Sequence, residues 1–251
     1  MSRVAIIAAM RGELKPLVDG WRHEPRNGVD LWRCESGNDE WVAACAGAGV
    51  DAATRAFSEI EKSGPVDRLI STGWAGALRE NFVAGRAYIV TGIVDARTGE
   101  HFPIAEWREE GSHGSKSWPV GPWLVTSHKV ADGAEKKRLA GVYDVGLVDM
   151  EAAGIARLAE MRGIPFYCVK GISDGYNEQM PDFNNFITPK GKFRLAAFVV
   201  FCMFRPMYWP TLLRMGENSK KAAQAIRESL LANLDGSGDF TNRNGYPNLE
   251  R

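Results

Sequence analysis

Cysteine and histidine are scarce in this sequence, and neither is spaced for metal binding or nucleophilic catalysis. There are four of each among 251 residues, without a C-x-x-C pair or a cysteine–histidine spacing typical of zinc sites. No serine or carboxylate stands at a motif spacing from a histidine, which argues against a hydrolytic serine triad. We therefore expect no metal site, and we expect reduced cysteines in a cytoplasmic protein.

An excess of charge of either sign is also missing. Lysine plus arginine and aspartate plus glutamate number 31 each, so no overall field attracts nucleic acid or an anionic membrane. We expect no nucleic-acid partner, and a charged ligand has to be held by local groups. With 45% hydrophobic and 25% charged residues, the chain differs from disordered proteins and has the material for a sizeable core.

Long hydrophobic runs are absent too. The N-terminal apolar run is too short for a secretory signal and meets charged residues at once, so we interpret it as a first strand. Within the apolar, aromatic stretch 195–215, the longest uncharged run, Leu195 to Phe204, has about half the length of a membrane-spanning helix. We interpret this stretch either as a buried or dimer-forming helix or as a segment in peripheral contact with a membrane. In the second interpretation, Arg205 and Arg214 face lipid headgroups while aromatic side chains insert, namely Phe201, Phe204, Tyr208 and Trp209.

Apolar runs and amphipathic segments alternate along the chain. We predict a buried strand over 3–9, a hairpin over 31–46 and an amphipathic helix over 50–62. Strand, helix and strand then follow one another in DVGLVDMEAAGIARLAEMRGIPFYCVKGISDG. This alternation predicts an α/β fold with a twisted, mostly parallel (mixed) central sheet flanked by helices on both faces.

The same pattern sets the expected domain limits. We predict a single domain over residues 1–234. The last residues, 235–251, are rich in glycine and asparagine and have little to bury, so we expect a disordered tail. Glycine-rich loops are predicted at 47–49 and 73–76, where backbone amides such as those of Ala48 and Gly73 can face a ligand.

Three acidic residues stand where predicted strands end: Glu13, Glu151 and Asp174. Each alone is typical of an ordinary first-turn or turn residue. In a parallel α/β sheet, however, the ligand cleft lies at the carboxyl ends of the strands, so these three can converge. Three carboxylates suit cleavage of a glycosidic bond, because one activates water, one stabilises positive charge on the sugar and one protonates the leaving base.

At these positions the sequence resembles the MTA/SAH nucleosidases of the purine nucleoside and uridine phosphorylase superfamily. Five motifs carry the resemblance, in order and with matching spacing: IIAAMRGELKPL, AGAGVDAA, STGWAGAL, VDMEAAGIA and VKGISDG. The resemblance implies a nucleoside phosphorylase-like fold, a small purine nucleoside as substrate and a homodimer. The apolar C-terminal helix is more loosely similar to hopanoid-associated phosphorylase-like proteins.

The resemblance also implies roles for individual residues. Glu13 corresponds to the base that deprotonates the attacking water. Glu151 and the backbone of Met150 correspond to the groups that hold the ribose hydroxyls. Asp174, oriented by Ser173, corresponds to the acid that protonates purine N7.

The adenine site implied by the resemblance lies in the loop after a late strand. Val130 corresponds to the side chain that covers the base, and the backbone of Ala131 to the group that reads its edge. Val130 lacks the aromatic ring often found there, which weakens stacking.

The sequence departs from the family pattern at other positions. Trp74 replaces a serine and is expected to fill space near the ribose. Lys170 replaces an arginine, which keeps the charge but loses the planar fork. Arg11 and Gly12 stand where nucleosidases usually carry acids. These changes bear on substrate choice more than on the reaction class.

The leading hypothesis is a purine nucleosidase that hydrolyses an adenine nucleoside with an apolar 5′ substituent, without a metal or an organic cofactor. A carboxylate at Glu13 favours water over phosphate, since it repels an anionic nucleophile. One alternative is a phosphorylase in which Arg11, Arg55 or Arg86 holds phosphate. A second is a nucleoside-binding protein without turnover, suggested by Trp74, and a third is a nucleosidase for a lipid-linked adenosine such as adenosylhopane.

Overall fold

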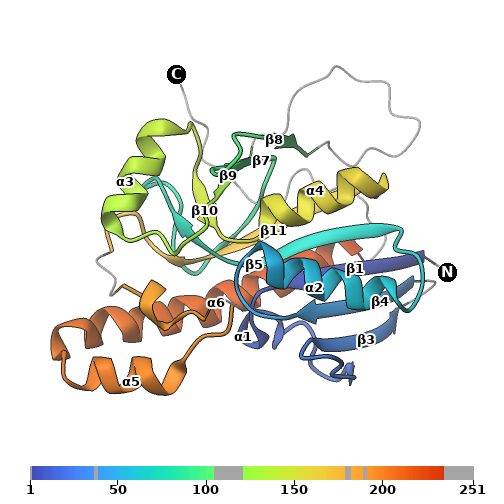
Figure 1. The fold of residues 1–251 in the computed structure, drawn as a ribbon, viewed down its shortest axis with the longest axis horizontal. Coiled ribbons are helices and arrows are strands. Elements are labelled where there is room, and N and C mark those ends of the chain that lie inside the picture. Colours follow the sequence, from blue (N-terminus) through green and yellow to red (C-terminus); the bar gives the residue numbers. More distant parts are fainter. Residues whose placement is uncertain (1, 37–38, 105–120, 179–181, 189–190, 235–251) are drawn as a thin grey trace.

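The protein folds around one mixed β-sheet with helices on both of its faces (Figure 1). The α/β architecture expected from the sequence is therefore confirmed. The computed structural model describes residues 2–36, 39–104, 121–178, 182–188 and 191–234. The predicted tail, 235–251, lies outside the described residues.

The N-terminal half of the sheet is built around β1 (Ser2–Ala8). This strand pairs in parallel with β4 (Asp39–Cys45) on one side and with β5 (Arg68–Ala77) on the other. The predicted hairpin is confirmed as β3 (Asp30–Ser36) and β4, and β2 (Arg22–His23) extends that edge. Since β1 and β5 are parallel, the segment that follows β1 lies beside the carboxyl end of β5.

The C-terminal half of the sheet is organised by β11 (Phe166–Asp174), which runs parallel to β5. The short β10 (Leu147–Asp149) pairs antiparallel with the end of β5 and parallel with β9 (Trp123–Thr126). Beyond β9 lies β7 (Gly92–Asp95), which is parallel to it, and β8 (His101–Pro103) pairs antiparallel with β7. On another edge, β6 (Ala87–Ile89) pairs antiparallel with β11.

The segment 73–76 differs from the sequence-based prediction. We expected a glycine-rich loop there, but β5 continues through it to Ala77 because β11 pairs with it residue by residue. Lys170 lies opposite Gly73, and Asp174 lies opposite Gly76 after a register shift in β11. The neighbouring strand β11 thus holds this segment extended by hydrogen bonds, although its glycine content alone predicts a loop.

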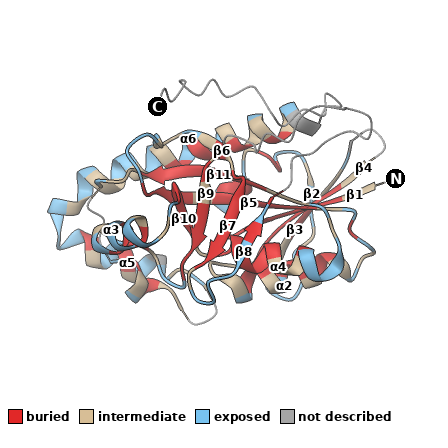
Figure 2. Ribbon diagram, turned by 90° about the horizontal axis from the view of Figure 1, so that it is seen from above, coloured by how far each residue is buried: buried red, intermediate tan, exposed pale blue. Residues whose placement is uncertain are grey.

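Helices cover the sheet on both faces because alternate residues of β1 enter different cores. Ala5 and Ile7 pack against α2 (Val50–Glu61) and α4 (Ala152–Arg162). Val4 and Ile6 pack in the core that contains residues of α1 (Arg11–Leu14) and α6 (Trp209–Leu234). Figure 2 shows the central strands of the sheet coloured as buried, with helices on both sides. The remaining helices are α3 (Gly133–Val142), α5 (Leu195–Met203), η1 (Asn184–Phe186) and η2 (Pro206–Tyr208).

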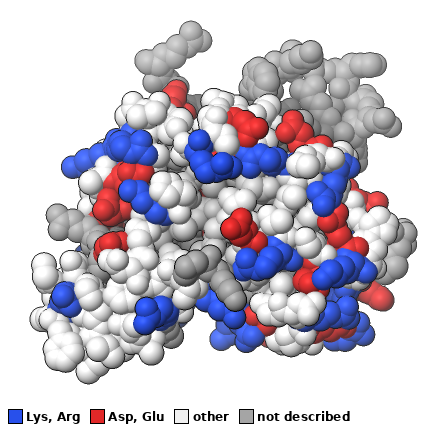
Figure 3. Space-filling view, viewed as in Figure 1, with Lys and Arg blue, Asp and Glu red and all other residues white. Residues whose placement is uncertain are grey.

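The hairpin formed by α5 and the first half of α6 extends beside the sheet instead of covering it (Figure 1). Basic and acidic side chains intermingle over much of the face in Figure 3, whereas the lobe at lower left, where this hairpin lies, is mostly uncharged. Within the described ranges, no single helix has the length and apolar composition to cross a membrane; Ala196–Met203 and Pro206–Ala232 meet these criteria only as a pair bent by 106°.

Candidate active site

Glu13 is buried and its carboxylate is held by backbone amides from two elements. Oε2 accepts hydrogen bonds from the N–H groups of Ala9 at 2.8 Å and Met10 at 2.7 Å, and Oε1 accepts one from Trp74 at 2.8 Å. Burial raises the pKa of Glu13, and these amides and the charge of Lys170 oppose the rise. Oε1 keeps a free lone pair, so the fixed carboxylate can still accept a hydrogen bond from water.

Gly73 makes room for this carboxylate. Its φ of +119° is a conformation that side-chain-bearing residues rarely adopt, and a Cβ there would lie 2.9 Å from Oε1 of Glu13. Gly73 is therefore required by the close approach of Glu13, in addition to the ligand role expected from the sequence.

Glu151 lies beside Glu13, at the N-terminus of α4. Its Oε1 accepts a hydrogen bond from the N–H of Gly49 at 2.7 Å, and Oε2 accepts one from Met150 at 3.3 Å. Burial, followed by the charge of Asp149, raises the pKa of Glu151 to about 8, and Glu13 adds to the rise. The structure thus brings two of the three predicted acids within electrostatic reach of each other.

A buried lysine, Lys170, offsets the negative charge of this acidic group. Lys170 donates from Nζ to the carbonyl of Thr72 at 3.0 Å and pairs with Oδ2 of Asp149 at 2.9 Å. Burial alone would lower the pKa of Lys170, but Asp149 and Glu151 raise it above its ordinary value. The ammonium is fully buried, so it neutralises Asp149 and acts on Glu13 and Glu151 through its field.

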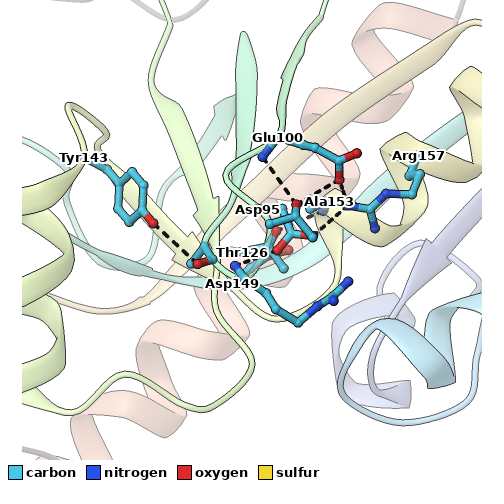
Figure 4. Close-up of polar contacts among 10 residues, drawn as sticks. Asp95, Glu100, Thr126, Tyr143, Asp149, Ala153 and Arg157 are labelled. Atoms are coloured by element: carbon cyan, nitrogen blue, oxygen red, sulfur yellow. Dashed lines mark hydrogen bonds and ion pairs between the residues drawn. The ribbon is translucent and has the colours of Figure 1, made fainter.

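Asp149 is held in place by the start of α4, as Figure 4 shows. Its Oδ1 accepts a hydrogen bond from Oγ1 of Thr126 at 2.7 Å, and Oδ2 accepts one from the N–H of Ala152 at 2.9 Å. Thr126 in turn accepts from the N–H of Ala153 at 2.9 Å. Asp149 therefore satisfies the first free N–H of α4, the helix that begins just after Glu151.

Asp174, the last residue of β11, forms a second polar group. Its Oδ1 accepts a hydrogen bond from Oγ of Ser173 at 2.6 Å; the orienting role expected for this serine stays a prediction. Its Oδ2 forms a buried ion pair with Nζ of Lys136 in α3. Lys136 also donates to the carbonyl of Gly175 at 2.7 Å. Sequence reasoning missed Lys136, although its three-residue spacing from the buried Leu139 indicates that both face inward.

The two polar groups lie along one strand. A Cβ at Gly73 would lie 2.9 Å from Glu13, and a Cβ at Gly76 would lie 3.0 Å from Oδ2 of Asp174. These glycines are three residues apart, which corresponds to about 10 Å along a strand. Glu13 and Glu151 therefore lie against one part of β5, and Asp174 lies against a later part of the same strand.

Trp74 is fixed at both its backbone and its indole ring. Its backbone binds Glu13, but its indole Nε1 donates to the carbonyl of Ser219 in α6 at 3.0 Å. A Cβ at Gly12 would lie 3.0 Å from the indole Cη2. The ring therefore fills the space between α1 and α6, next to the position where related nucleosidases were expected to carry an acid.

Val130 and Ala131 lie in the loop after β9, against η1. The carboxamide of Asn184 binds both backbone groups of Val130: Oδ1 accepts from its N–H at 2.8 Å, and Nδ2 donates to its carbonyl at 3.1 Å. The side chain of Val130 packs on the aromatic cluster of α5, and Ala131 is buried. Asn184, which the sequence analysis did not identify, therefore fixes this loop.

Ala48 lies in the predicted loop between β4 and α2. Its N–H donates to the carbonyl of Gly191 at 2.9 Å, so this amide is engaged within the protein. The neighbouring amide of Gly49 points at Glu151 instead. Among the residues that the structure describes, no cluster of histidine, cysteine, aspartate and glutamate suited to a metal ion is found.

The fold and this arrangement of acids define an α/β protein of the nucleoside phosphorylase type. The family described as the phosphorylase superfamily matches residues 3–200, and the chain belongs to it. This agrees with the family expected from the motifs. No curated protein matches the sequence.

Solved structures share the fold at low sequence identity. The 5′-methylthioadenosine/S-adenosylhomocysteine nucleosidase of S. pneumoniae has a TM-score of 0.65 and 19% identity, over 92% of this chain and 97% of its own. The 5′-methylthioadenosine nucleosidase of Arabidopsis thaliana has a TM-score of 0.65 and 15% identity, over 94% and 95%. The futalosine hydrolase of Helicobacter pylori has a TM-score of 0.63 and 15% identity, over 93% of this chain and 97% of its own. The homodimer implied by the sequence stays a prediction.

Proposed function

We propose that this protein is a purine nucleosidase that hydrolyses the N-glycosidic bond of an adenine nucleoside with an apolar 5′ substituent. The observation that carries the proposal is the buried Glu13 carboxylate, which three backbone amides hold beside Glu151. Such a group is positioned without the reorganisation that a mobile side chain requires.

In the proposed reaction, the bond between ribose C1′ and purine N9 breaks and its electron pair moves into the purine. A water oxygen bonds to C1′, and Glu13 takes a proton from that water. Glu151 binds the ribose hydroxyls and, when ionised, favours positive charge on the sugar. Asp174 delivers to N7 a proton that the ammonium of Lys136 supplies to its carboxylate, so that the base leaves as a neutral molecule. In this proposal the sugar lies at the part of β5 near Gly73, next to Glu13, and the base lies towards Gly76 and Asp174.

Two features favour water over phosphate as the nucleophile. The Glu13 carboxylate lies at the proposed sugar end, and a carboxylate repels an incoming anion. Arg11, one candidate for holding phosphate, is engaged by Asp30 through two hydrogen bonds of 2.6 and 2.5 Å. The similar solved structures also include proteins named as nucleosidases and a hydrolase.

The proposed substrate class depends on the motif resemblance and on these relatives. The names of the S. pneumoniae and Arabidopsis proteins specify adenine nucleosides with a sulfur-linked 5′ group. The loop at Val130 and Ala131, held by Asn184, is the proposed contact for the adenine edge.

The test is release of free base from purified protein, with and without inorganic phosphate. We expect adenine and a free reducing sugar from 5′-methylthioadenosine without phosphate, and a slower rate from adenosine. Glu13→Gln should reduce the rate by about 10²–10⁴-fold. Glu59→Gln, which changes a buried carboxylate on α2 outside the site, should retain the wild-type rate of base release.

The outcomes separate the alternatives. Formation of ribose 1-phosphate only when phosphate is present would assign the protein as a phosphorylase. Calorimetric binding of adenine nucleosides without any base release would assign it as a binding protein. Either result excludes the proposed hydrolysis.

A further inference from the structure

The α5–α6 hairpin, defined here as residues 192–215, packs around an aromatic cluster. The ring of Phe198 lies 5.0 Å from that of Phe183, 5.3 Å from that of Phe186 and 5.3 Å from that of Phe193. Indole Nε1 of Trp209 donates to the carbonyl of Cys202 at 2.8 Å and ties the two helices together. The inner face of the hairpin is thus covered by its own side chains and by Phe183 and Phe186.

The outer face carries large apolar side chains that contact water. At the elbow between the helices, Phe204 is 78% exposed and Met207 is 75% exposed, and Leu213 on α6 is 72% exposed. Val199, Val200 and Met203 on α5 and part of Trp209 on α6 are also exposed. Single exposed apolar residues are ordinary, but a run of them on one protruding element is typical of an interaction surface.

The charged residues of the hairpin itself, 192–215, are all basic. From residue 183 to 216 the sequence contains no aspartate or glutamate. Lys192, Arg194, Arg205 and Arg214 are exposed on the hairpin, and Figure 3 shows isolated blue patches within this mostly white lobe. Aromatic and aliphatic side chains ringed by cations match an anionic lipid surface, where the apolar groups enter the interface and the cations meet headgroups.

A second copy of the chain fits this surface less well. In a two-fold dimer the same patch meets itself, so the four cations of each copy would approach without acidic partners. Like charges placed across an interface are unfavourable. The charge pattern therefore favours an anionic partner over self-association.

The second half of α6 limits how the hairpin can meet a bilayer. Ala222, Ala223, Ile226 and Leu230 are buried, and a Cβ at Gly171 of β11 would lie 2.8 Å from Ala222. This half belongs to the domain core. Contact is thus confined to the elbow and the exposed face next to it.

We propose that the α5–α6 hairpin docks the protein on the surface of an anionic lipid bilayer, with Phe204, Met207 and Leu213 in the interface and the arginines at the headgroups. Because Val130 packs on the same aromatic cluster, docking holds the base end of the candidate site close to the membrane. The docking itself does not depend on the proposed reaction.

The test is co-sedimentation of the full chain with large vesicles. Vesicles of equimolar phosphatidylglycerol and phosphatidylcholine should bind the protein, vesicles of phosphatidylcholine alone should bind it weakly, and added salt should reduce binding. Phe204→Ser combined with Met207→Ser should weaken binding by on the order of tenfold or more. Arg194→Gln combined with Arg214→Gln should weaken binding to anionic vesicles by about fivefold per charge.

Matched controls keep this test independent of folding. Met161→Ser removes a side chain that is 74% exposed on α4, away from the hairpin, and should bind vesicles like the wild type. The apolar and charge variants act at exposed positions and should keep the wild-type circular dichroism spectrum. Each should also keep any nucleosidase activity on a water-soluble substrate.

Three results would overturn the proposal: no binding to anionic vesicles, equal loss of binding in Met161→Ser, or undiminished binding in both hairpin variants. A wild-type dimer that Phe204→Ser and Met207→Ser convert to monomers in analytical ultracentrifugation would assign the surface to a second copy instead. Loss of base release without loss of vesicle binding would concern the proposed function alone.

Discussion

Gly12 and Trp74 are matched in size across the junction of α1 and β5. A Cβ at residue 12 would lie 3.0 Å from Cη2 of the indole, closer than carbon atoms normally pack. The indole is held from its other end by the carbonyl of Ser219, so it cannot easily move away. The two departures from the family pattern are therefore one structural adjustment: the tryptophan occupies space that only a glycine at residue 12 leaves open.

This pairing predicts a coupled effect on stability. Gly12→Val should lower the free energy of unfolding by about 1–3 kcal/mol, because it overpacks the indole. In a Trp74→Ala background the same substitution should cost much less, with a coupling of about 0.5–3 kcal/mol. Urea denaturation of the wild type, the two single variants and the double variant measures this coupling. Equal costs in both backgrounds would show that the indole does not limit residue 12.

The buried pair of Lys136 and Asp174 leads to a second cycle. Lys136→Met leaves the carboxylate of Asp174 buried without its cation, and removal of one partner of such a pair typically costs about 3–5 kcal/mol. Adding Asp174→Asn removes the stranded charge, so the double variant should be more stable than Lys136→Met alone. Thermal or urea unfolding tests this order, and Lys137→Met on the exposed side of α3 is the matched control. A double variant that is less stable than either single one would contradict it.

The raised pKa of Glu151 predicts how stability changes with pH. Burial and Asp149 raise that pKa from 4.5 to about 8, so the folded state binds more protons than the unfolded state between these values. Stability should therefore fall as the pH rises from about 4.5 to about 8, and this contribution should level off above that range. Glu13, whose pKa is also raised by burial, adds a slope of the same sign.

Glu151→Gln isolates the contribution of Glu151. A glutamine does not titrate, so the variant should keep only the slope that Glu13 and other groups supply. The measurement is urea unfolding at a series of pH values across this range. Identical slopes in wild type and variant would show that Glu151 is ionised throughout, in conflict with its burial next to Asp149.

The fold and one end of the site were accessible from sequence because they depend on local patterns. Glu13 and Glu151 follow strands whose apolar runs are unmistakable, and parallel strands end at one edge of a sheet. The helix predicted over 50–62 is found at 50–61 because its amphipathic pattern is local. These are predictions that a single stretch of chain can carry.

The other features depend on pairs of residues that are distant in sequence. Lys136 looks like its neighbour Lys137, and only contact with Asp174, 38 residues away, distinguishes it. Asn184 acts on a loop 54 residues earlier. Gly73 was assigned to a loop because its strand partner, β11, comes nearly a hundred residues later. Composition and periodicity do not encode such contacts.

The proposed acid can be separated from the proposed base by changing the leaving group. Asp174→Asn should reduce kcat for an adenine nucleoside by about 10²–10⁴-fold with little change in KM, because the proton is needed mainly in the transition state. A nitrophenyl riboside leaves as a stable anion that needs no proton. Its hydrolysis should therefore be nearly unaffected by Asp174→Asn but should be lost in Glu13→Gln, since water must still be activated.

Steady-state kinetics of both variants on both substrates tests this, with Ser173→Ala expected to show a smaller loss on the nucleoside alone. If Asp174→Asn slowed the nitrophenyl riboside and the nucleoside equally, its role would be structural or at the sugar, and Asp174 would not be the acid that protonates the base.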